Sequence, residues 1–380
     1  MTQPASVADY RELARRRLPA ILFQYMDGGS YAEVTLRRNV EDMEALALRQ
    51  RVLVDVSKLN MAVELFGQQL SMPLMLGPVG MSGMYSRRGE CSAARAAHKA
   101  GLVHALSTLS ICGIEEVSRA APIWYQLYMV KDRGYMRALL QRAKDAKVGC
   151  LLFTVDLPVP GTRYRDYRTG LTGTLSTLDH IKRAWDGITH PDWFWDVYLQ
   201  GRPHDFGNLQ AAIAEAEAGA DYWAWIRNNF DPSLTWNDFA WIREHWDGPI
   251  VIKGVLDPED AKECVRVGAE GIVVSNHGGR QLDGALSSIA ALPAIADAVG
   301  DDLTVLMDGG VRNGLDILKA MALGAKGVLI GRAWAYALAA HGEAGVSHIL
   351  ATLRAELAAA MALTGCTDVT KADRTLLANL

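Results

Sequence analysis

A short segment of the chain combines the residue types needed for proton transfer and for anion binding. In GIVVSNHGGRQLDG (residues 271–284), an apolar run ends near His277, and two glycines separate this histidine from Arg280. Histidine accepts a proton near neutral pH, and the planar guanidinium of arginine matches a carboxylate or a phosphate. The two glycines allow backbone conformations that other residues rarely adopt, at the positions between the two side chains. The segment predicts a strand that ends in a base and an anion clamp, and an incidental histidine on a surface loop is the alternative.

Such a site needs secondary-structure elements that bring distant segments together, and the chain shows an alternation of strand-like and helix-like segments. Short apolar runs alternate with helix-like stretches, which is typical of a parallel sheet. These runs lie at residues 72–78, 103–108, 124–128, 150–156, 250–254, 271–276, 304–310 and 327–332. Eight βα units in a chain of this size predict an α/β fold, the (β/α)8 TIM barrel, whose active site lies at the carboxyl ends of the strands. A doubly wound sheet is the weaker alternative, because no G-x-G-x-x-G follows the first run.

The rest of the chain is expected to add a cap and an insertion to this single domain. Residues 1–72 carry helical patterning and predict an N-terminal helical cap, and residues 73–156 and 249–360 form the barrel. Residues 157–248 interrupt the alternation and predict a long insertion after strand 4, partly membrane-facing or flexible. Its aromatic and basic cluster comprises Trp185, Trp193, Phe194, Trp195, Tyr198, Lys182 and Arg183. That composition suits a membrane interface, and packing of the rings on the barrel is the alternative.

The composition of the chain excludes several classes of protein. Half of its 380 residues are hydrophobic, which is enough for a large core. A formal net charge of -4 and a pI near 6.2 leave no electrostatic footprint for nucleic acid. The five cysteines are scattered without a C-x-x-C pair, so neither a disulfide framework nor a metal site is expected, and a reducing cytoplasm fits best.

The N-terminal region contains an apolar stretch that imitates an export signal. Pro19, Gln24 and Asp27 interrupt this stretch, and no small-residue cleavage site follows it, so export is not expected. No uninterrupted apolar run reaches the length of about 18 residues needed to cross a bilayer. Any attachment to a membrane is therefore expected to be peripheral.

The last two predicted strands end in loops that suit a phosphate. DGGVRNG (residues 308–314) and GRAW (residues 331–334) combine glycines with arginines, and barrels of this kind build phosphate sites after strands 7 and 8. The residues expected at the phosphate are Gly309, Gly310, Arg312, Gly331 and Arg332. Asp308 is suited to accept a hydrogen bond from a ribityl or ribose hydroxyl. Glycines that only turn the chain are the alternative.

Lys253 is the single charge in the apolar run PIVIKG. A buried cation needs a compensating anion or an electron-rich ring, so this lysine is expected to have a function. A Schiff-base lysine is one possible role. A fixed positive charge that stabilises a reduced, anionic flavin is the other, and the adjoining phosphate site favours it.

Together these motifs resemble those of the FMN-dependent L-2-hydroxy acid dehydrogenases and oxidases. The resemblance runs from about Tyr10 to Cys366 and rests on SNHGGRQLDG, FTVDLPVPGTRYRD, WYQLY, VIKGV, DGGVRNG and IGR. Further segments are most similar to the bacterial respiratory, quinone-linked L-lactate dehydrogenases of this family. These segments are FQYMDGGSY, TLRRNVEDM, GMYSRRGE, GRPHDFGN and NNFDPS.

The resemblance implies a role for each matching residue. It makes His277 the active-site base with Asp156 as its partner, and it places Tyr128 at the substrate hydroxyl. Lys253 stabilises negative charge on the cofactor. The residues implied for the substrate carboxylate are Tyr25 and Arg280, and Arg163 is implied to add a second positive charge over the substrate pocket. Those implied for the FMN ring are Val79, Gly80, Ser107, Gln126, Thr154, Lys253 and Ser275, and those for the phosphate and ribityl chain are Asp308, Gly309, Gly310, Arg312, Gly331 and Arg332.

The reaction implied by the resemblance is the oxidation of L-lactate to pyruvate. It implies electron transfer to the quinone pool, a peripheral location on the cytoplasmic side of the bacterial inner membrane, and a homotetramer. Another L-2-hydroxy acid, of the mandelate or glycolate type, with oxygen or another acceptor is the alternative. A non-catalytic barrel that binds a phosphorylated ligand is the alternative from a different class. Whether His277 takes the hydroxyl proton or the Cα proton stays open, and Gly80 and Leu109 stand where the family varies the wall beside the substrate side chain.

Overall fold

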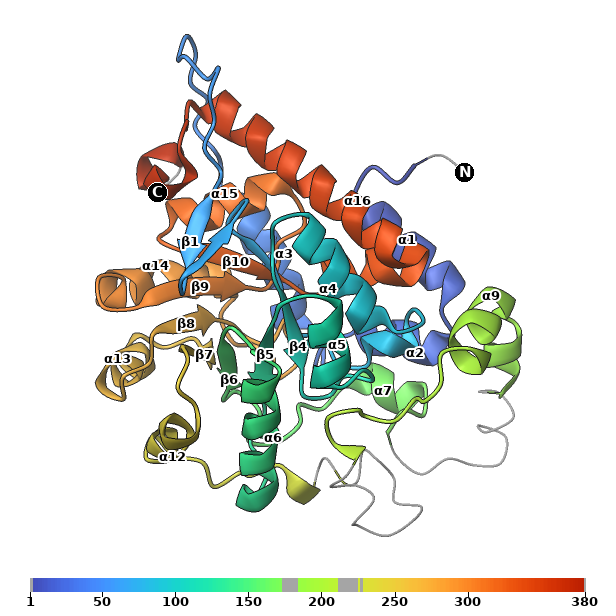
Figure 1. The fold of residues 1–380 in the computed structure, drawn as a ribbon. Coiled ribbons are helices and arrows are strands. Elements are labelled where there is room, and N and C mark those ends of the chain that lie inside the picture. Colours follow the sequence, from blue (N-terminus) through green and yellow to red (C-terminus); the bar gives the residue numbers. More distant parts are fainter. Residues whose placement is uncertain (1–2, 173–183, 211–224, 226–227, 379–380) are drawn as a thin grey trace.

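The computed structural model describes residues 3–172, 184–210, 225 and 228–378. Eight parallel strands close into a barrel in the order β10-β3-β4-β5-β6-β7-β8-β9 (Figure 1). The strands are β3 (Leu74–Leu76), β4 (His104–Ser107), β5 (Ile123–Leu127), β6 (Leu151–Thr154), β7 (Ile250–Val255), β8 (Gly271–Val274), β9 (Thr304–Asp308) and β10 (Gly327–Ile330). Each coincides with one of the eight predicted runs to within one residue at its ends or lies inside it, so the predicted (β/α)8 barrel is confirmed. The strands are almost entirely buried, which explains their continuous apolar sequences.

Helices follow the strands and surround the barrel (Figure 1). They are α4 (Gly89–Lys99), α5 (Ile114–Ala120), α6 (Arg133–Asp145), α12 (Asp238–His245), α13 (Pro258–Arg266), α14 (Ser288–Val299), α15 (Gly314–Ala322) and α16 (Arg332–Thr364). Side-chain caps define several of their starts: Asp132, Asp257 and Ser287 each accept a hydrogen bond from a backbone N–H in the first turn of α6, α13 and α14. Such a cap typically stabilises a helix by about 1 kcal/mol. Because every strand runs in the same direction, all their carboxyl ends meet at one end of the barrel.

The last helix of the barrel, α16, is unusually long and apolar. Among the described residues it is the one helix whose length and composition would allow it to cross a membrane. Its apolar side chains instead pack against α1 (Val7–Arg17), α4 and α15. Non-helical backbone at His341 and Gly342 also divides it. It therefore belongs to the outer layer of the barrel.

The N-terminal cap consists of α1, α2 (Ala20–Asp27) and α3 (Val34–Ala45). It also contains a hairpin of two short strands, β1 (Val63–Leu65) and β2 (Gln68–Leu70), which the sequence pattern did not predict. Phe66 and Gly67 turn this hairpin with positive φ angles of 52° and 77°. The Phe66 ring packs 5.6 Å from that of Trp124 near the start of β5, so the hairpin lies at the amino ends of the strands.

The insertion after β6 contains α7 (Tyr164–Arg168) and α9 (Pro191–Trp193), which continues into a π-helical turn. Part of its aromatic cluster packs on the barrel: Trp193 is buried and donates its indole N–H to the Met84 carbonyl at 2.8 Å. Trp193 is therefore not available for the expected membrane interface. Trp185 and Trp195 are 68% and 62% exposed. Lys182 and Arg183 lie outside the described residues.

Candidate active site

A cavity of about 260 Å³ lies at the carboxyl ends of the strands, and each strand of the barrel, or the segment directly after it, contributes to its wall. Most of the predicted site residues line it: Tyr25, Val79, Gly80, Ser107, Tyr128, Thr154, Arg163, Lys253, His277, Arg280, Asp308, Gly309, Gly310, Arg312, Gly331 and Arg332. The other three lie behind this wall and contact lining residues. Gln126 accepts a hydrogen bond from Ser107, Asp156 contacts His277, and Ser275 accepts from Lys253. The cavity thus brings together residues spread from position 25 to position 332.

His277 lies between an acid and a phenol. Its Nδ1 is 2.8 Å from Asp156 Oδ1, and its Nε2 is 3.3 Å from the Tyr128 hydroxyl. Burial lowers the pKa of His277 below its ordinary value, and Asp156 only partly offsets this. Burial alone raises the pKa of Asp156, but His277 and Lys253 leave it below its ordinary value. The pair therefore rests as neutral imidazole and carboxylate near pH 7, with Nε2 on the cavity side as the proton acceptor.

The backbone after β8 turns sharply to present His277. His277, Gly278 and Gly279 have φ angles of 59°, 64° and 71°, all in the left-handed region. A Cβ at Gly279 would lie 2.6 Å from the backbone nitrogen of Leu36, so only glycine fits there. The histidine itself adopts this conformation without being glycine, and such strain is common where a catalytic side chain must be aimed. Ser275 Oγ helps to hold the turn by accepting the His277 N–H at 3.0 Å.

Two guanidinium groups flank Tyr25 on the anion-binding side of the cavity. The Arg280 guanidinium carbon is 4.8 Å from the centroid of the Tyr25 ring, and that of Arg163 is 5.8 Å away. Arg280 Nη1 donates to the carbonyls of Tyr25 and Gly28, at 2.6 and 2.7 Å, which fixes the guanidinium in place. Asp166 lies 3.6 Å from Arg163 as a partial counter-ion. Two half-buried cations beside one carboxylate leave positive charge for an incoming carboxylate.

Lys253 is buried, and its contacts decide its protonation state. Its Nζ donates to Ser275 Oγ at 2.8 Å and forms an ion pair with Asp308 Oδ2 at 3.0 Å. Burial alone lowers the pKa of Lys253, but Asp308 and Asp156 outweigh it and raise the pKa above its ordinary value. A permanently protonated ammonium is unsuited to the Schiff-base role and suits that of a fixed positive charge.

Several buried polar atoms at or beside the cavity lack a hydrogen-bond partner within the described part of the chain, among them three on residues expected to bind FMN. These three are Gln126 Nε2, Thr154 Oγ1 and Asp308 Oδ1. An unsatisfied buried polar group costs about 1–3 kcal/mol, so such groups usually serve a ligand. An amide donor and a hydroxyl match the polar edge of a flavin ring, and a carboxylate oxygen matches a ribityl hydroxyl. The residues present therefore fit FMN.

The loops after β9 and β10 approach other segments closely. Gly309 and Gly310 have φ angles of 91° and 88°, and a Cβ at Gly310 would lie 2.0 Å from the Asn39 carbonyl oxygen. Arg332 lines the cavity, yet it donates to the carbonyls of Met26, Gly278 and Gly28 at 3.2, 2.9 and 2.7 Å. Burial lowers its pKa to about 10. Besides its predicted role at a phosphate, this side chain therefore ties the loop after β8 to the end of α2.

Among the cavity residues that the sequence analysis did not name as site residues, Phe230 and Asp166 contact proposed site residues. The Phe230 ring from the insertion lies 5.1 Å from the Tyr128 ring and lines the cavity. No sequence signal separates it from the other aromatic residues of the insertion. Asp166 is buried in the cavity wall, and its spacing of three residues from Arg163 was the signal that would have found it.

Comparisons with known proteins agree with this site. The sequence profile described as FMN-dependent dehydrogenase matches residues 14–379. The L-lactate dehydrogenase of Chromohalobacter salexigens is 57% identical over 363 residues, covering 95% of this chain and 92% of the relative. That of Caulobacter vibrioides is 56% identical over 376 residues, covering 98% and 97%.

Solved structures share the whole fold. The crystal structure of the monotopic membrane protein (S)-mandelate dehydrogenase has a TM-score of 0.91 and 34% identity and covers 100% of both chains. Mandelate oxidase with (S)-4-hydroxymandelic acid has a TM-score of 0.84 and 37% identity and covers 98% of both chains. The chain therefore belongs to the FMN-dependent dehydrogenase family, and its cofactor is FMN.

Proposed function

We propose that this protein oxidises L-lactate to pyruvate. The observation that carries the proposal is the placement of the His277–Asp156 pair and the Arg163–Arg280 pair on one cavity. A 2-hydroxy acid presents a hydroxyl next to a carboxylate, so it needs a base and an anion clamp side by side. The two relatives named above, at 57% and 56% identity, are both L-lactate dehydrogenases, which selects lactate among the 2-hydroxy acids.

Each side chain has a separate task in the proposed reaction. Arg280 and Arg163 hold the substrate carboxylate and thereby orient the carbon that is oxidised. His277 Nε2 takes a proton from the substrate, and the Asp156 carboxylate stabilises the imidazolium that results. The Tyr128 phenol stays protonated, because burial raises its pKa, and it donates a hydrogen bond at the substrate hydroxyl. When bound, FMN supplies the electron acceptor of the reaction, and Lys253 keeps a positive charge beside its site.

A larger substrate is the second candidate, because one wall of the cavity is lined by a glycine. A Cβ at Gly80 would lie 3.4 Å from Leu109 Cβ and 3.4 Å from Tyr25 Oη, so the glycine leaves room beside the substrate. The solved structural neighbours named above are a mandelate dehydrogenase and a mandelate oxidase. Comparing kcat/KM for L-lactate and (S)-mandelate separates the two candidates.

We also propose that the protein binds a membrane peripherally and passes electrons to a quinone. A monotopic structural neighbour and the exposed aromatic residues of the insertion support this proposal. The exposed apolar side chains near α9 are Trp185, Ile188, Trp195, Tyr198 and Leu199. Aromatic rings favour the membrane interface. The cytoplasmic face of the bacterial inner membrane and the homotetramer stay predictions, which spheroplast protease protection and sedimentation analysis test.

The absorption spectrum of the purified protein tests the function most directly. Flavin bands that bleach on anaerobic addition of L-lactate, but not of D-lactate, are expected. Bands that persist with L-lactate but bleach with (S)-mandelate would move the assignment to the second candidate. A protein without flavin bands after reconstitution with FMN would contradict the enzyme assignment altogether.

A further inference from the structure

We propose that Arg165 is a positioning residue for the carboxylate site. The proposal rests on the function proposed above. The α7 segment, defined as residues 157–168, carries Arg163 and Asp166 to the cavity wall but belongs to the insertion rather than to the barrel. Something must therefore hold this segment at the right distance from Tyr25, which lies on α2.

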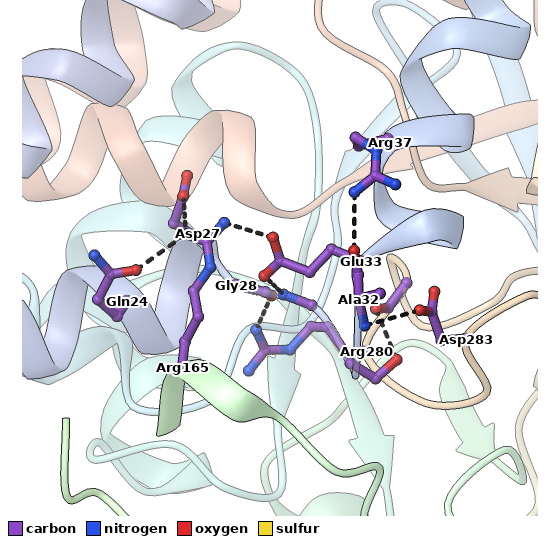
Figure 2. A network of polar contacts seen from close by, with 12 residues as sticks. Gln24, Asp27, Gly28, Ala32, Glu33, Arg37, Arg165, Arg280 and Asp283 are labelled. Atoms are coloured by element: carbon purple, nitrogen blue, oxygen red, sulfur yellow. Dashed lines mark hydrogen bonds and ion pairs between the residues drawn. The ribbon is translucent and has the colours of Figure 1, made fainter. Parts of the chain in front are cut away.

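Arg165 makes that connection through three side chains of the cap. Its Nη1 donates to Asp27 Oδ2 at 2.8 Å and to Gln24 Oε1 at 3.0 Å, and its Nη2 donates to Glu33 Oε2 at 2.6 Å (Figure 2). Within the described part of the chain, these ion pairs to Asp27 and Glu33 are the only ones that join the α7 segment to the cap. The charge of Arg165 therefore ties the insertion to the cap.

Asp27, which accepts a hydrogen bond from Arg165, is itself held in place by other residues. Asp27 is 5% exposed and also accepts from Arg11 at 2.5 and 2.8 Å and from the Tyr336 hydroxyl at 2.7 Å. Burial alone raises the pKa of Asp27, but Arg11, Tyr336 and Arg165 bring it down to about 2. Asp27 is thus a carboxylate anchored between α1 and α16. Because Arg11 and Tyr336 stay in place when Arg165 is replaced, Asp27 keeps partners and the cap keeps its fold.

The contacts of Arg165 also set the geometry of the anion clamp, which consists of Tyr25, Arg163 and Arg280. Asp27 and Tyr25 are two residues apart on α2, and Arg165 and Arg163 are two residues apart across the start of α7. The contact of Arg165 with Asp27 therefore also fixes the position of Arg163 relative to Tyr25. The Arg163 guanidinium carbon lies 5.8 Å from the centroid of the Tyr25 ring. The segment also contacts the cap without ion pairs, through the hydrogen bond from the Tyr31 N–H to the Thr162 carbonyl at 2.8 Å and through the edge-on contact of the Tyr31 and Tyr164 rings, whose centroids are 5.9 Å apart. Loss of the Arg165 charge should loosen the clamp without touching the proton acceptor His277.

Arg165→Gln tests the proposal, with Arg168→Gln as the matched control. Arg168 is exposed on the same short helix. Arg165→Gln should raise KM for L-lactate about tenfold or more while kcat changes less than about threefold, since it weakens binding rather than chemistry. Calorimetric titration with oxalate, a dicarboxylate that cannot be oxidised by loss of a Cα hydrogen, should show the same loss of affinity. Arg165→Lys should recover part of that affinity, and Arg168→Gln should match the wild type.

The outcomes separate this inference from the proposed function. If wild-type flavin does not bleach with L-lactate, the proposed function fails, whereas the oxalate titrations still report on the clamp. Unchanged KM and oxalate affinity in Arg165→Gln would overturn the inference. A parallel loss of kcat, FMN content and melting temperature would also overturn it, because that pattern indicates a merely structural role.

Discussion

His277 and Asp156 form a hydrogen-bonded pair in which Nδ1 and Oδ1 are 2.8 Å apart, although 121 positions separate the two residues in the chain. Asp156 follows β6 and His277 follows β8, so β7 lies between the strands that carry them. The pair exists because parallel strands of the barrel end at one level. It leaves Nε2 of the histidine on the cavity side.

Replacing the proposed base should abolish turnover without removing the cofactor. His277→Gln keeps a polar side chain of similar length but cannot accept the substrate proton, so kcat should fall by about 10²–10⁴-fold. FMN content, measured by the flavin absorbance of the purified variant, should match the wild type. A variant that retains normal turnover would show that another residue is the base.

Replacing its partner should move the pH profile in a defined direction. His277 acts as a base only when it is neutral, so kcat/KM should fall as the pH drops through its pKa, which burial holds below the ordinary value. Asp156 raises that pKa by its charge. Asp156→Asn should therefore shift the acidic limb to lower pH and also lower the plateau, because the imidazolium is no longer stabilised. A limb that moves to higher pH would contradict the assigned pairing.

The buried ion pair of Lys253 should be costly to break. Lys253→Met leaves the Asp308 carboxylate without its cation in a low-dielectric site, which costs about 3–5 kcal/mol. A clear drop in the melting temperature and weaker FMN retention are expected. Lys262→Met removes an exposed pair with Glu259 on α13 and should leave both quantities nearly unchanged. Equal effects of the two variants would mean that burial of the pair has no energetic consequence.

Substrate size should respond to the glycine in the cavity wall. The added Cβ of Gly80→Ala has ordinary contact distances, so the variant should fold and bind FMN, but it reduces the space beside the substrate side chain. We expect the ratio of kcat/KM for (S)-mandelate to that for L-lactate to fall about tenfold. FMN absorbance serves as the control for cofactor loss. An unchanged ratio would place the side-chain wall elsewhere.

Membrane binding should depend on the exposed rings of the insertion. In the double variant Trp185→Ser/Trp195→Ser, the fraction of protein that sediments with liposomes should drop severalfold. The rate of lactate oxidation with a soluble dye as electron acceptor should stay at the wild-type value. The double variant Val52→Ser/Leu53→Ser serves as the control, because it removes even more exposed apolar side chains from the segment before β1. If the control variant lost binding instead, the membrane surface would lie on that loop.

The sequence by itself determined the barrel and the composition of its site. Strands that are buried on both faces require continuous apolar runs, so the eight runs could be recognised one by one. The polar residues that end these runs, such as His277 and Asp308, were then expected at one end of the barrel by the geometry of parallel strands. The hairpin of β1 and β2 escaped recognition because strands of three residues leave too little pattern.

The pairing of His277 with Asp156 was expected from the family resemblance, but only the tertiary structure decided the other pairings. Three contacts join segments far apart in the chain. They are the ion pair of Lys253 with Asp308, the hydrogen bond of buried Trp193 to Met84 and the ion pair of Arg165 with Asp27. Local sequence patterns reflect the periodicity of a single helix or strand, whereas such pairings depend on how the closed barrel, the cap and the insertion pack together. For that reason the carboxylate partner of Lys253 and the role proposed for Arg165 follow from the structure alone.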